Sequence, residues 1–285
     1  MIGGLAVRGN LLCVTWSAAR GHVFLYDLEA RQRVSSWTTP VGPAGFSDAA
    51  GVALDEHFRV FVADPHNDCV RRFNVFGQHL GDLGEPPPGE GDRGRDRVGV
   101  LDRPHGVAVV GDRLYVALGE RPRQRGVQCF ATDGRVLRPL AAQGDAHLCF
   151  GAPRGIAADE RGVVVADTLR SALQVFRPDG SFLREYPGCG RPVAVARASD
   201  GTLWFVDRDA EPGLCCLGVD GVRRPVGELG ERCRDPLAVA VDAKDRVYLL
   251  DHDGERVLRA SPRGEVVELL VDLVEHDLDA PNHSP

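Results

Sequence analysis

Residues 51–77 read GVALDEHFRVFVADPHNDCVRRFNVFG, and this stretch carries the pattern that decides the fold. Three runs rich in β-branched and aromatic residues begin at Gly51, Phe61 and Val70, and polar, turn-forming residues separate them. Short runs of this kind between Asp, Asn and Gly are typical of β-strands rather than helices. The stretch therefore predicts consecutive strands joined by short turns.

The first of these runs recurs along the whole chain, at intervals of 37 to 55 residues. Internal repetition at such a period is a signature of propellers and related repeat folds. The chain is therefore predicted to consist of six equivalent units. Their first runs are Gly4-Leu5-Ala6-Val7, Gly51-Val52-Ala53-Leu54, Gly106-Val107-Ala108-Val109, Gly155-Ile156-Ala157-Ala158, Pro192-Val193-Ala194-Val195 and Pro236-Leu237-Ala238-Val239.

Each unit contains two further apolar runs and a turn after the third. The second run ends at Trp16, Asp64, Leu118, Asp167, Asp207 or Asp251, and the third at Tyr26, Phe73, Phe130, Phe176, Leu217 or Ala260. Four residues beyond the third run lies Gly77, Gly134, Gly180, Gly221 or Gly264, and three of these follow an aspartate. Asp-Gly pairs suit tight hairpin turns. With the strand beyond that turn, each unit is predicted to have four strands.

Six four-stranded units cannot each bury two sheet faces alone, and radial packing covers both faces and shortens the exposed edges. The sequence thus predicts an all-β fold, a six-bladed β-propeller of four-stranded antiparallel blades. We expect one domain over residues 1–275, with blades that begin near residues 3, 50, 105, 154, 191 and 235. Residues 276–285 are expected to form an acidic and polar C-terminal tail.

The repeat resembles that of the NHL family, and the fold it implies is NHL/TolB-like. Residues 51–77 carry the fullest match, and the fourth unit is close, with Gly155-Ile-Ala-Ala-Asp, Val165-Ala-Asp-Thr168 and Leu173-Gln-Val-Phe176. The likeness covers roughly residues 3–272. It implies an interaction module, because NHL domains generally serve that purpose.

Charge and composition narrow the classes of partner. The formal net charge is −7, and residues 264–285 contain six acids and no lysine or arginine, so the rest is nearly neutral. A dedicated nucleic-acid binder needs a cationic face, which makes nucleic acid an improbable partner. No apolar run is long enough to span a bilayer. The first residues lack the basic and apolar regions of a signal peptide, so we expect a cytoplasmic protein with reduced cysteines and no membrane partner.

Local catalytic signatures are missing, since the sequence contains no G-x-S-x-G, H-E-x-x-H, P-loop or EF-hand pattern. A ligand is instead expected at the axial mouth, where the connections enter the inner strands. The residue before each first run would lie there, which gives Gly3, Ala50, His105, Arg154, Arg191 and Asp235. One imidazole and two guanidinium groups predict a site for an anion or an acidic peptide. The alternative is a solvated rim in which Arg154 or Arg191 pairs with Asp235.

Two similar propeller families hold a metal at this mouth. The amidating lyases use histidines from several blades, but here only His105 matches, and a catalytic zinc needs three protein ligands. The regucalcin-like lactonases use a cage of Glu, Asn and Asp, whereas this chain has only four asparagines. Cys149, Cys189 and Cys233 lie on neighbouring entrance loops and are weaker candidates for a soft metal or a disulfide. We predict no cofactor and keep a divalent metal as an open alternative.

The aspartates that end the second run in four units, namely Asp64, Asp167, Asp207 and Asp251, have a simpler interpretation. An acid at the end of a strand accepts backbone N–H bonds and fixes the following turn. A catalytic carboxylate would not recur in four blades. These aspartates are therefore predicted to be structural.

The sequence is compatible with three candidate functions of the protein. The leading hypothesis is a non-catalytic scaffold that recognises a protein or peptide through a loop face or the mouth. The peptide could be acidic. The long charged connections 84–103 and 119–126 favour this hypothesis. The second is a metal-dependent hydrolase or lyase that uses His105, Asp235 and the entrance cysteines. The third is RNA binding, supported only by arginines 93, 95, 97, 103, 121, 123 and 125, among which six acids lie.

Overall fold

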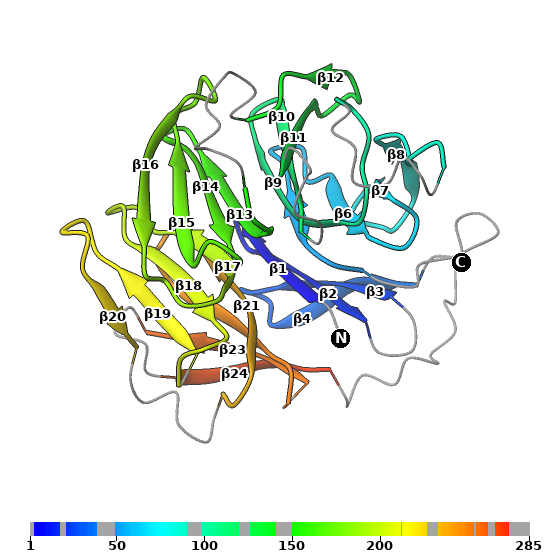
Figure 1. Cartoon of the computed structure of the whole chain (residues 1–285). Helices are drawn as coiled ribbons and strands as arrows, with labels where there is room; N and C mark the ends of the chain where they lie inside the picture. Colours follow the sequence, from blue (N-terminus) through cyan, green and yellow to red (C-terminus); the bar gives the residue numbers. More distant parts are fainter. Residues whose placement is uncertain are drawn as a thin grey trace.

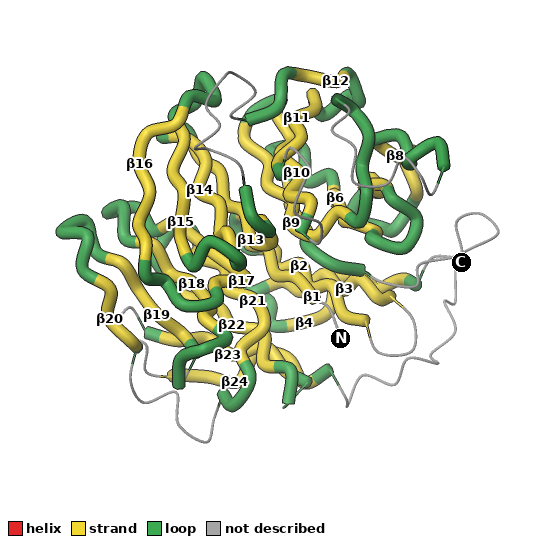
Figure 2. The backbone as a smooth tube through the Cα atoms, in the orientation of Figure 1, coloured by secondary structure: helices red, strands yellow, loops and turns green. Residues whose placement is uncertain are grey.

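The computed structural model is an all-β six-bladed β-propeller, which confirms the predicted fold class. It describes residues 3–17, 21–38, 49–89, 98–119, 126–140, 150–211, 213–226, 233–253, 255–261 and 266–273. Within these residues, 24 strands form six four-stranded antiparallel sheets and there is no helix (Figures 1 and 2).

Four consecutive strands make up each blade in the first half of the chain. Blade 1 contains β1 (Gly3–Arg8), β2 (Leu11–Ser17), β3 (Gly21–Asp27) and β4 (Gln32–Trp37). Blade 2 contains β5 (Val52–Leu54), β6 (Val60–Asp64), β7 (Cys69–Phe73) and β8 (His79–Leu83). Blade 3 contains β9 (Pro104–Val110), β10 (Arg113–Leu118), β11 (Val127–Ala131) and β12 (Val136–Leu137).

The second half of the chain repeats this organisation. Blade 4 contains β13 (Pro153–Asp159), β14 (Gly162–Asp167), β15 (Ala172–Phe176) and β16 (Phe182–Pro187). Blade 5 contains β17 (Pro192–Arg197), β18 (Leu203–Asp207), β19 (Leu214–Leu217) and β20 (Arg223–Pro225). Blade 6 contains β21 (Pro236–Val241), β22 (Val247–Asp251), β23 (Arg256–Ala260) and β24 (Val266–Asp272).

The first strand of every blade lies at the axis. The inner strands β1, β5, β9, β13, β17 and β21 contact one another around the ring, while β8, β12, β16, β20 and β24 lie at the rim (Figure 1). Every described sheet takes its strands in chain order, so blades 1 and 6 share no sheet. The ring is therefore closed by side-chain packing between these two blades and not by a shared strand.

The apolar core is divided among the six interfaces between neighbouring blades. Each cluster of buried residues joins one pair of blades; for example, Leu5, Trp16 and Phe24 of blade 1 pack with Tyr248 and Leu250 of blade 6. The second strand of each blade is almost wholly buried, because a neighbouring blade covers each of its faces. This explains why the second apolar run of each unit is continuous and does not alternate.

The predicted Asp-Gly turns join the third and fourth strands of blades 3, 4 and 5. The glycines have positive φ values of 109°, 84° and 75° at Gly134, Gly180 and Gly221. The preceding aspartates accept a hydrogen bond from the backbone N–H two residues ahead, at 3.0 Å for Asp133, 2.8 Å for Asp179 and 3.0 Å for Asp220. Aspartate thus fixes the turn through its side chain and glycine supplies the left-handed backbone.

Candidate functional site at the axial mouth

The inner strands of four blades bulge by one residue near the mouth, and this bulge sets which side chain faces the opening. In blade 3 the pairing passes from Ala117↔Gly106 to Leu118↔Pro104, so His105 is the extra residue. The corresponding residue is Arg154 in blade 4, Val193 in blade 5 and Leu237 in blade 6. An extra residue in one strand re-aims its side chain.

This register corrects the sequence alignment of blades 5 and 6. The sequence placed Arg191 and Asp235 in the positions of His105 and Arg154, but the structure places Val193 and Leu237 there, two residues later. Pro192 pairs with Asp207 in the way that Pro153 pairs with Asp167. Side chains on a strand alternate with a period of two, so a shift of two residues preserves the apolar pattern. The signal for the correct register is the proline before each bulge, namely Pro104, Pro153, Pro192 and Pro236.

A cavity of about 270 Å³ opens at this mouth and has three levels. We call His105, Arg154, Arg191 and Arg208 the cationic entrance; Val193 and Leu237 lie beside them. The neck consists of small residues, namely Gly4, Gly51, Gly106, Gly155, Ala194 and Ala238. The aliphatic floor has one residue from each blade: Leu5, Val52, Val107, Ile156, Val195 and Val239.

Neighbouring inner strands approach so closely at the neck of blades 2 and 3 that a Cβ atom does not fit at Gly51 or Gly106. A Cβ atom on Gly51 would lie 2.5 Å from the carbonyl oxygen of His105, and one on Gly106 would lie 2.2 Å from that of Arg154. The Gly51 N–H donates to the same His105 oxygen at 2.7 Å, which links blade 2 to blade 3 at the axis. The glycines of the repeat therefore allow six inner strands to converge.

A second cavity of about 190 Å³ adjoins the aliphatic floor on the side away from the mouth. All six floor residues line both cavities. The second cavity also contacts Arg8, Asp159 and Arg197. Asp159 forms ion pairs with both Arg161 and Arg197, so the lining of that end contains an acid, whereas the lining at the mouth contains none.

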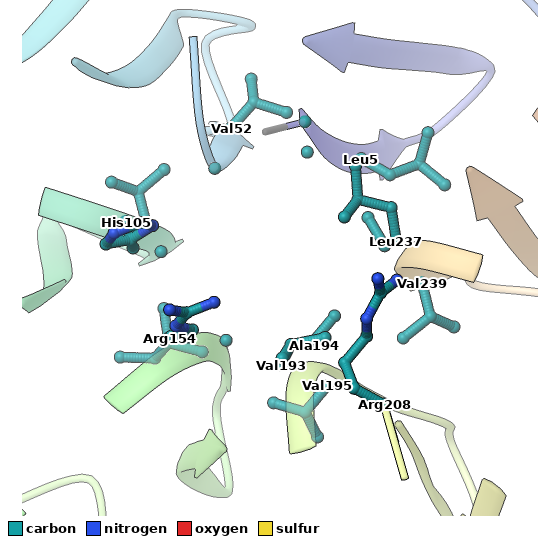
Figure 3. A pocket seen from close by; sticks show the side chains of 18 of the residues that line it. Leu5, Val52, His105, Arg154, Val193, Ala194, Val195, Arg208, Leu237 and Val239 are labelled. Atoms are coloured by element: carbon teal, nitrogen blue, oxygen red, sulfur yellow. The ribbon is translucent and has the colours of Figure 1, made fainter. Parts of the chain in front are cut away.

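The cationic entrance carries an excess of positive charge. The lining of the cavity contains three arginines and a histidine but no acid. Arg208 pairs with Asp235, and Arg191 lies 3.7 Å from Asp209, with both side chains more than half exposed. Within the part of the chain that the structure describes, no carboxylate pairs with Arg154. Figure 3 shows His105 and Arg154 on one side of the opening and Arg208 on another, with the guanidinium groups extending into it.

Of the six residues that the sequence placed at the mouth, the structure brings four into the cavity lining, namely Gly3, His105, Arg154 and Arg191, and Ala50 is not among them. Asp235 lies outside that lining, and its partner is Arg208 rather than Arg154 or Arg191. The sequence analysis missed Arg208, which directly follows Asp207 at the end of β18. The residue after each block-ending position, which also includes Thr168 and His252, forms a second column of the repeat that would have indicated it.

The block-ending aspartates are buried and hold the entrance loops. Asp167 accepts hydrogen bonds from the N–H groups of Gly151 and Ala152, at 2.7 and 2.8 Å. In blade 6, Asp251 accepts one from the N–H of Asp235 at 3.0 Å. Asp64 instead accepts from Asn67 of the following turn, at 3.1 Å. These contacts agree with the structural role that the sequence predicted.

Burial raises the pKa of Asp167 above the ordinary value, and its backbone hydrogen bonds oppose that shift only partly. The side-chain partner of Asp167 is the neutral amide of Gln174, at 3.2 Å. In blade 2 the same strand position holds Arg71, whose guanidinium pairs with Asp64 at 2.7 Å. The two blades thus hold equivalent carboxylates with different electrostatic support.

The structure does not bring the candidate thiols together. Cys189 belongs to the cluster between blades 4 and 5, and Cys233 to the cluster between blades 5 and 6. Burial raises the pKa of Cys189 to about 11 and also raises that of Cys233, so both stay neutral thiols near pH 7. Cys149 lies outside the described residues, as do residues 276–285.

One group of metal-ligating side chains occurs among the described residues. Ligand atoms of Asp235, His252 and Asp253 lie within 4.8 Å of one another. The guanidinium of Arg208 pairs with Asp235, which places a positive charge beside the carboxylate that would bind the cation. This contact disfavours a metal at that group.

The arginines that supported RNA binding lie mostly outside the described residues. Arg103 is described and exposed, whereas Arg93, Arg95, Arg97, Arg121, Arg123 and Arg125 are not described. Among the described residues there is also no helix with the length and apolarity that a membrane crossing requires.

Solved structures with the same architecture include enzymes and binding proteins. A streptogramin B lyase superposes with a TM-score of 0.64 at 14% identity, over 93% of this chain and 81% of that one. A chain of a nidogen/laminin complex gives 0.64 at 18% identity, over 92% and 93%. A catalytically inactive virginiamycin B lyase from Staphylococcus aureus, with quinupristin, gives 0.62 at 14%, over 93% and 83%. At such identities the likeness shows the fold alone. No protein-family model and no curated protein matches the sequence.

Proposed function

We propose that this protein is a non-catalytic binding scaffold that recognises a protein or peptide at its axial mouth and takes up an anionic group of that ligand. The observation that carries the proposal is the cationic entrance, which lines the cavity without an acid. Exposed guanidinium groups form charge-assisted, bidentate hydrogen bonds with carboxylates and phosphates. The proposal includes an NHL-type repeat, on the residues of 51–77, and a cytoplasmic location.

Arg154 is the strongest anion ligand in this proposal. It is exposed, and it lies beside His105 at the bulges of adjacent blades. Arg208 and Arg191 each have an aspartate neighbour, so an incoming anion competes with Asp235 or Asp209 for them. A ligand anion therefore gains most binding free energy from Arg154. It can also pair with Arg208 and Arg191 when it displaces Asp235 and Asp209 from them.

The experiment measures binding of a fluorescein-labelled peptide rich in Asp and Glu, with an uncharged peptide of equal length as its control. We expect the acidic peptide to bind and the Arg154→Glu variant to lose at least about tenfold in affinity, since charge reversal replaces attraction with repulsion. The matched control is Arg135→Glu, because Arg135 is an exposed arginine outside the cavity lining. Equal affinities for both peptides, or equal binding by wild type and Arg154→Glu, would overturn the proposal.

The competing function is a metal-dependent hydrolase or lyase. The lyases among the structural neighbours favour it, as does the group of Asp235, His252 and Asp253. Elemental analysis for Ca, Zn and Fe and turnover of a small ester or lactone distinguish the two functions. We expect neither stoichiometric metal nor turnover. A metal bound in proportion to protein, together with turnover that Asp235→Asn abolishes, would establish the enzyme instead.

The same binding assay with a labelled single-stranded RNA distinguishes RNA binding from peptide binding. We expect weaker binding than for the acidic peptide, because the chain carries a net charge of −7. Affinity for RNA that exceeds that for the peptide and falls steeply with added salt would support RNA as the ligand.

A further inference from the structure

The cavity at the mouth changes in chemical character with depth. Arg154, Arg191 and Arg208 line its opening on the side of blades 4 and 5, glycine and alanine form its neck, and six aliphatic residues that it shares with the second cavity line it below. We propose that the mouth binds a carboxylate that bears a short aliphatic group, with the carboxylate at the cationic entrance and the aliphatic group in the neck, against the floor. This inference rests on the proposed function, and it specifies which part of the ligand enters.

The size of the cavity limits what can enter. Small-molecule pockets measure about 300 to 1,000 Å³, and this cavity, at about 270 Å³, lies just below that range. It therefore holds one small molecule or one end of a longer chain. Since Arg154, Arg191 and Arg208 line only the cavity at the mouth, we expect the charged end of the ligand at the mouth and its apolar part toward the floor, where the second cavity adjoins.

The floor is the reason to prefer an aliphatic carboxylate over a purely acidic peptide. A run of acidic side chains would satisfy the cationic entrance but would leave the floor facing water or a polar group. An aliphatic group would contact the parts of Leu5, Val107 and Ile156 that face the cavity, and most of the apolar surface removed from water would be its own, because these side chains are otherwise buried between blades. Each methylene buried in this way raises affinity by about fourfold.

The neck lies between the carboxylate and the floor, and glycine and alanine residues line it. Gly51, Gly106 and Gly155 expose backbone and no polar side chain to the cavity. Charged side chains can therefore contact the ligand at the entrance but not in the neck. This arrangement fixes the orientation of the ligand, with the charged end outward and the apolar group inward.

Two sources offer this chemistry. One is the free C-terminus of a peptide whose last residue is Val, Leu or Ile, where the carboxylate and an aliphatic side chain share one carbon atom. The other is a free branched-chain carboxylic acid. Both place one carboxylate within a few bonds of a small aliphatic group, and the peptide would leave through the open mouth.

The first experiment is a calorimetric titration of the whole protein with acetate, propionate, butyrate, 3-methylbutyrate and 4-methylpentanoate. We expect affinity to rise about fourfold for each added carbon until the floor is reached, and then to level off. The amide of 3-methylbutyrate is the matched neutral ligand and should not bind. Affinity that stays flat along the series would overturn the inference.

The second experiment compares three peptides of the same sequence that end in free Leu, in Leu amide or in free Asp. If the ligand is a C-terminus, the free Leu peptide binds more than tenfold more tightly than the other two. If 4-methylpentanoate binds and the free Leu peptide does not, the ligand is a small carboxylic acid. Both results support the inferred chemistry and identify its source.

Variants test the two ends of the cavity separately. Arg154→Met should weaken every carboxylate, acetate included, whereas Arg135→Met should change none. Val107→Thr should weaken 4-methylpentanoate while leaving acetate unchanged, because Val107 lies at the floor and in the core between blades 2 and 3 but not at the entrance. Ile156→Val, a milder change, removes one carbon from the floor and should shift the best ligand to a longer chain. Thermal unfolding of each variant identifies any that fails to fold.

The outcomes separate this inference from the proposed function. If acidic peptides bind through Arg154 but neither chain length nor Val107→Thr matters, the inference falls and the binding scaffold stands. If no anionic probe binds at all, both fall together. An affinity that rises with chain length but is insensitive to Arg154→Met would place the apolar site elsewhere and overturn the inference.

Discussion

The buried carboxylate of Asp207 accepts a hydrogen bond from the backbone N–H of Arg191, with 2.7 Å between Oδ1 and N. Asp207 ends β18, and Arg191 lies on the loop that enters β17 of the same blade. The same carboxylate also accepts the N–H of Asp209 at 2.9 Å and pairs with Arg223. One acid thus holds two backbone segments that border the mouth.

Replacing this acid should destabilise blade 5. In Asp207→Ala the N–H groups of Arg191 and Asp209 lose their acceptor and Arg223 loses its counter-charge, so we expect the free energy of unfolding to fall by about 3 kcal/mol. Urea denaturation measures the change. Asp209→Ala is the control, since that side chain is 54% exposed and should cost less than about 0.5 kcal/mol. Equal losses in both variants would show that Asp207 does not hold the loops.

The close approach of the inner strands predicts that a larger residue at Gly51 in the neck destabilises the protein. In Gly51→Ala the new Cβ would lie 2.5 Å from the carbonyl oxygen of His105, so blades 2 and 3 must move apart. Overpacking against backbone costs about 1–3 kcal/mol, and we expect the upper part of that range. Gly89→Ala is the matched control, because no atom lies within 4 Å of its added Cβ. Chemical denaturation of both variants tests this, and equal stabilities would contradict it.

The interface between blades 6 and 1 should open before the others. Chain connections link every other neighbouring pair, but side chains alone join this one, with Trp16 and Tyr248 in its cluster. Trp16→Ala should cost about 3–5 kcal/mol and speed amide exchange in β1 and β21 selectively. Trp204→Ala is the matched change in the cluster between blades 5 and 6.

Hydrogen exchange followed by mass spectrometry provides the measurement for this pair. Trp204→Ala should lose similar stability, but its exchange should increase across the whole domain, because a chain connection resists separation of blades 5 and 6. Identical exchange maps for the two variants would show that the ring has no preferred opening.

The pH dependence of stability should reflect Asp167. Its pKa is raised in the folded protein, so the folded state binds this proton more tightly than the unfolded chain does. The contribution of Asp167 to the free energy of unfolding therefore falls as the pH rises from its ordinary pKa of 3.8 through its raised pKa in the folded protein. Gln174→Arg supplies the cation that Arg71 gives Asp64, and should lower the pKa of Asp167 and remove this decline.

Denaturation between about pH 3.5 and 6, with carbon NMR of the Asp167 carboxyl group, tests this prediction. Gln128→Arg is a control in blade 3, where the block-ending residue is Leu118 and no carboxylate is available at that place. If Gln174→Arg leaves the titration of Asp167 unchanged, the contrast between blades 2 and 4 does not arise from the partner on the third strand.

The sequence was informative wherever local chemistry repeats. Residues 51–77 and their copies predicted the strands, the Asp-Gly turns and the propeller, because each blade must cover the same two faces. His105, Arg154 and Arg191 were predicted at the mouth because the entrance lies before the first run in every unit. Arg208 was missed, since its place depends on a turn between strands rather than on the entrance loop.

What the sequence determined by itself is the repeated alternation that makes six blades and the small residues that let them meet at an axis. Which residues face one another across that axis was decided only by the tertiary structure. Val193 and Leu237 occupy the bulge positions, two residues beyond Arg191 and Asp235, and alternation alone cannot reveal this offset because a shift of two residues returns every side chain to its own face. The partner of Asp235 was decided in the same way, since Arg208 is 27 residues away in the chain and meets it only in the folded ring.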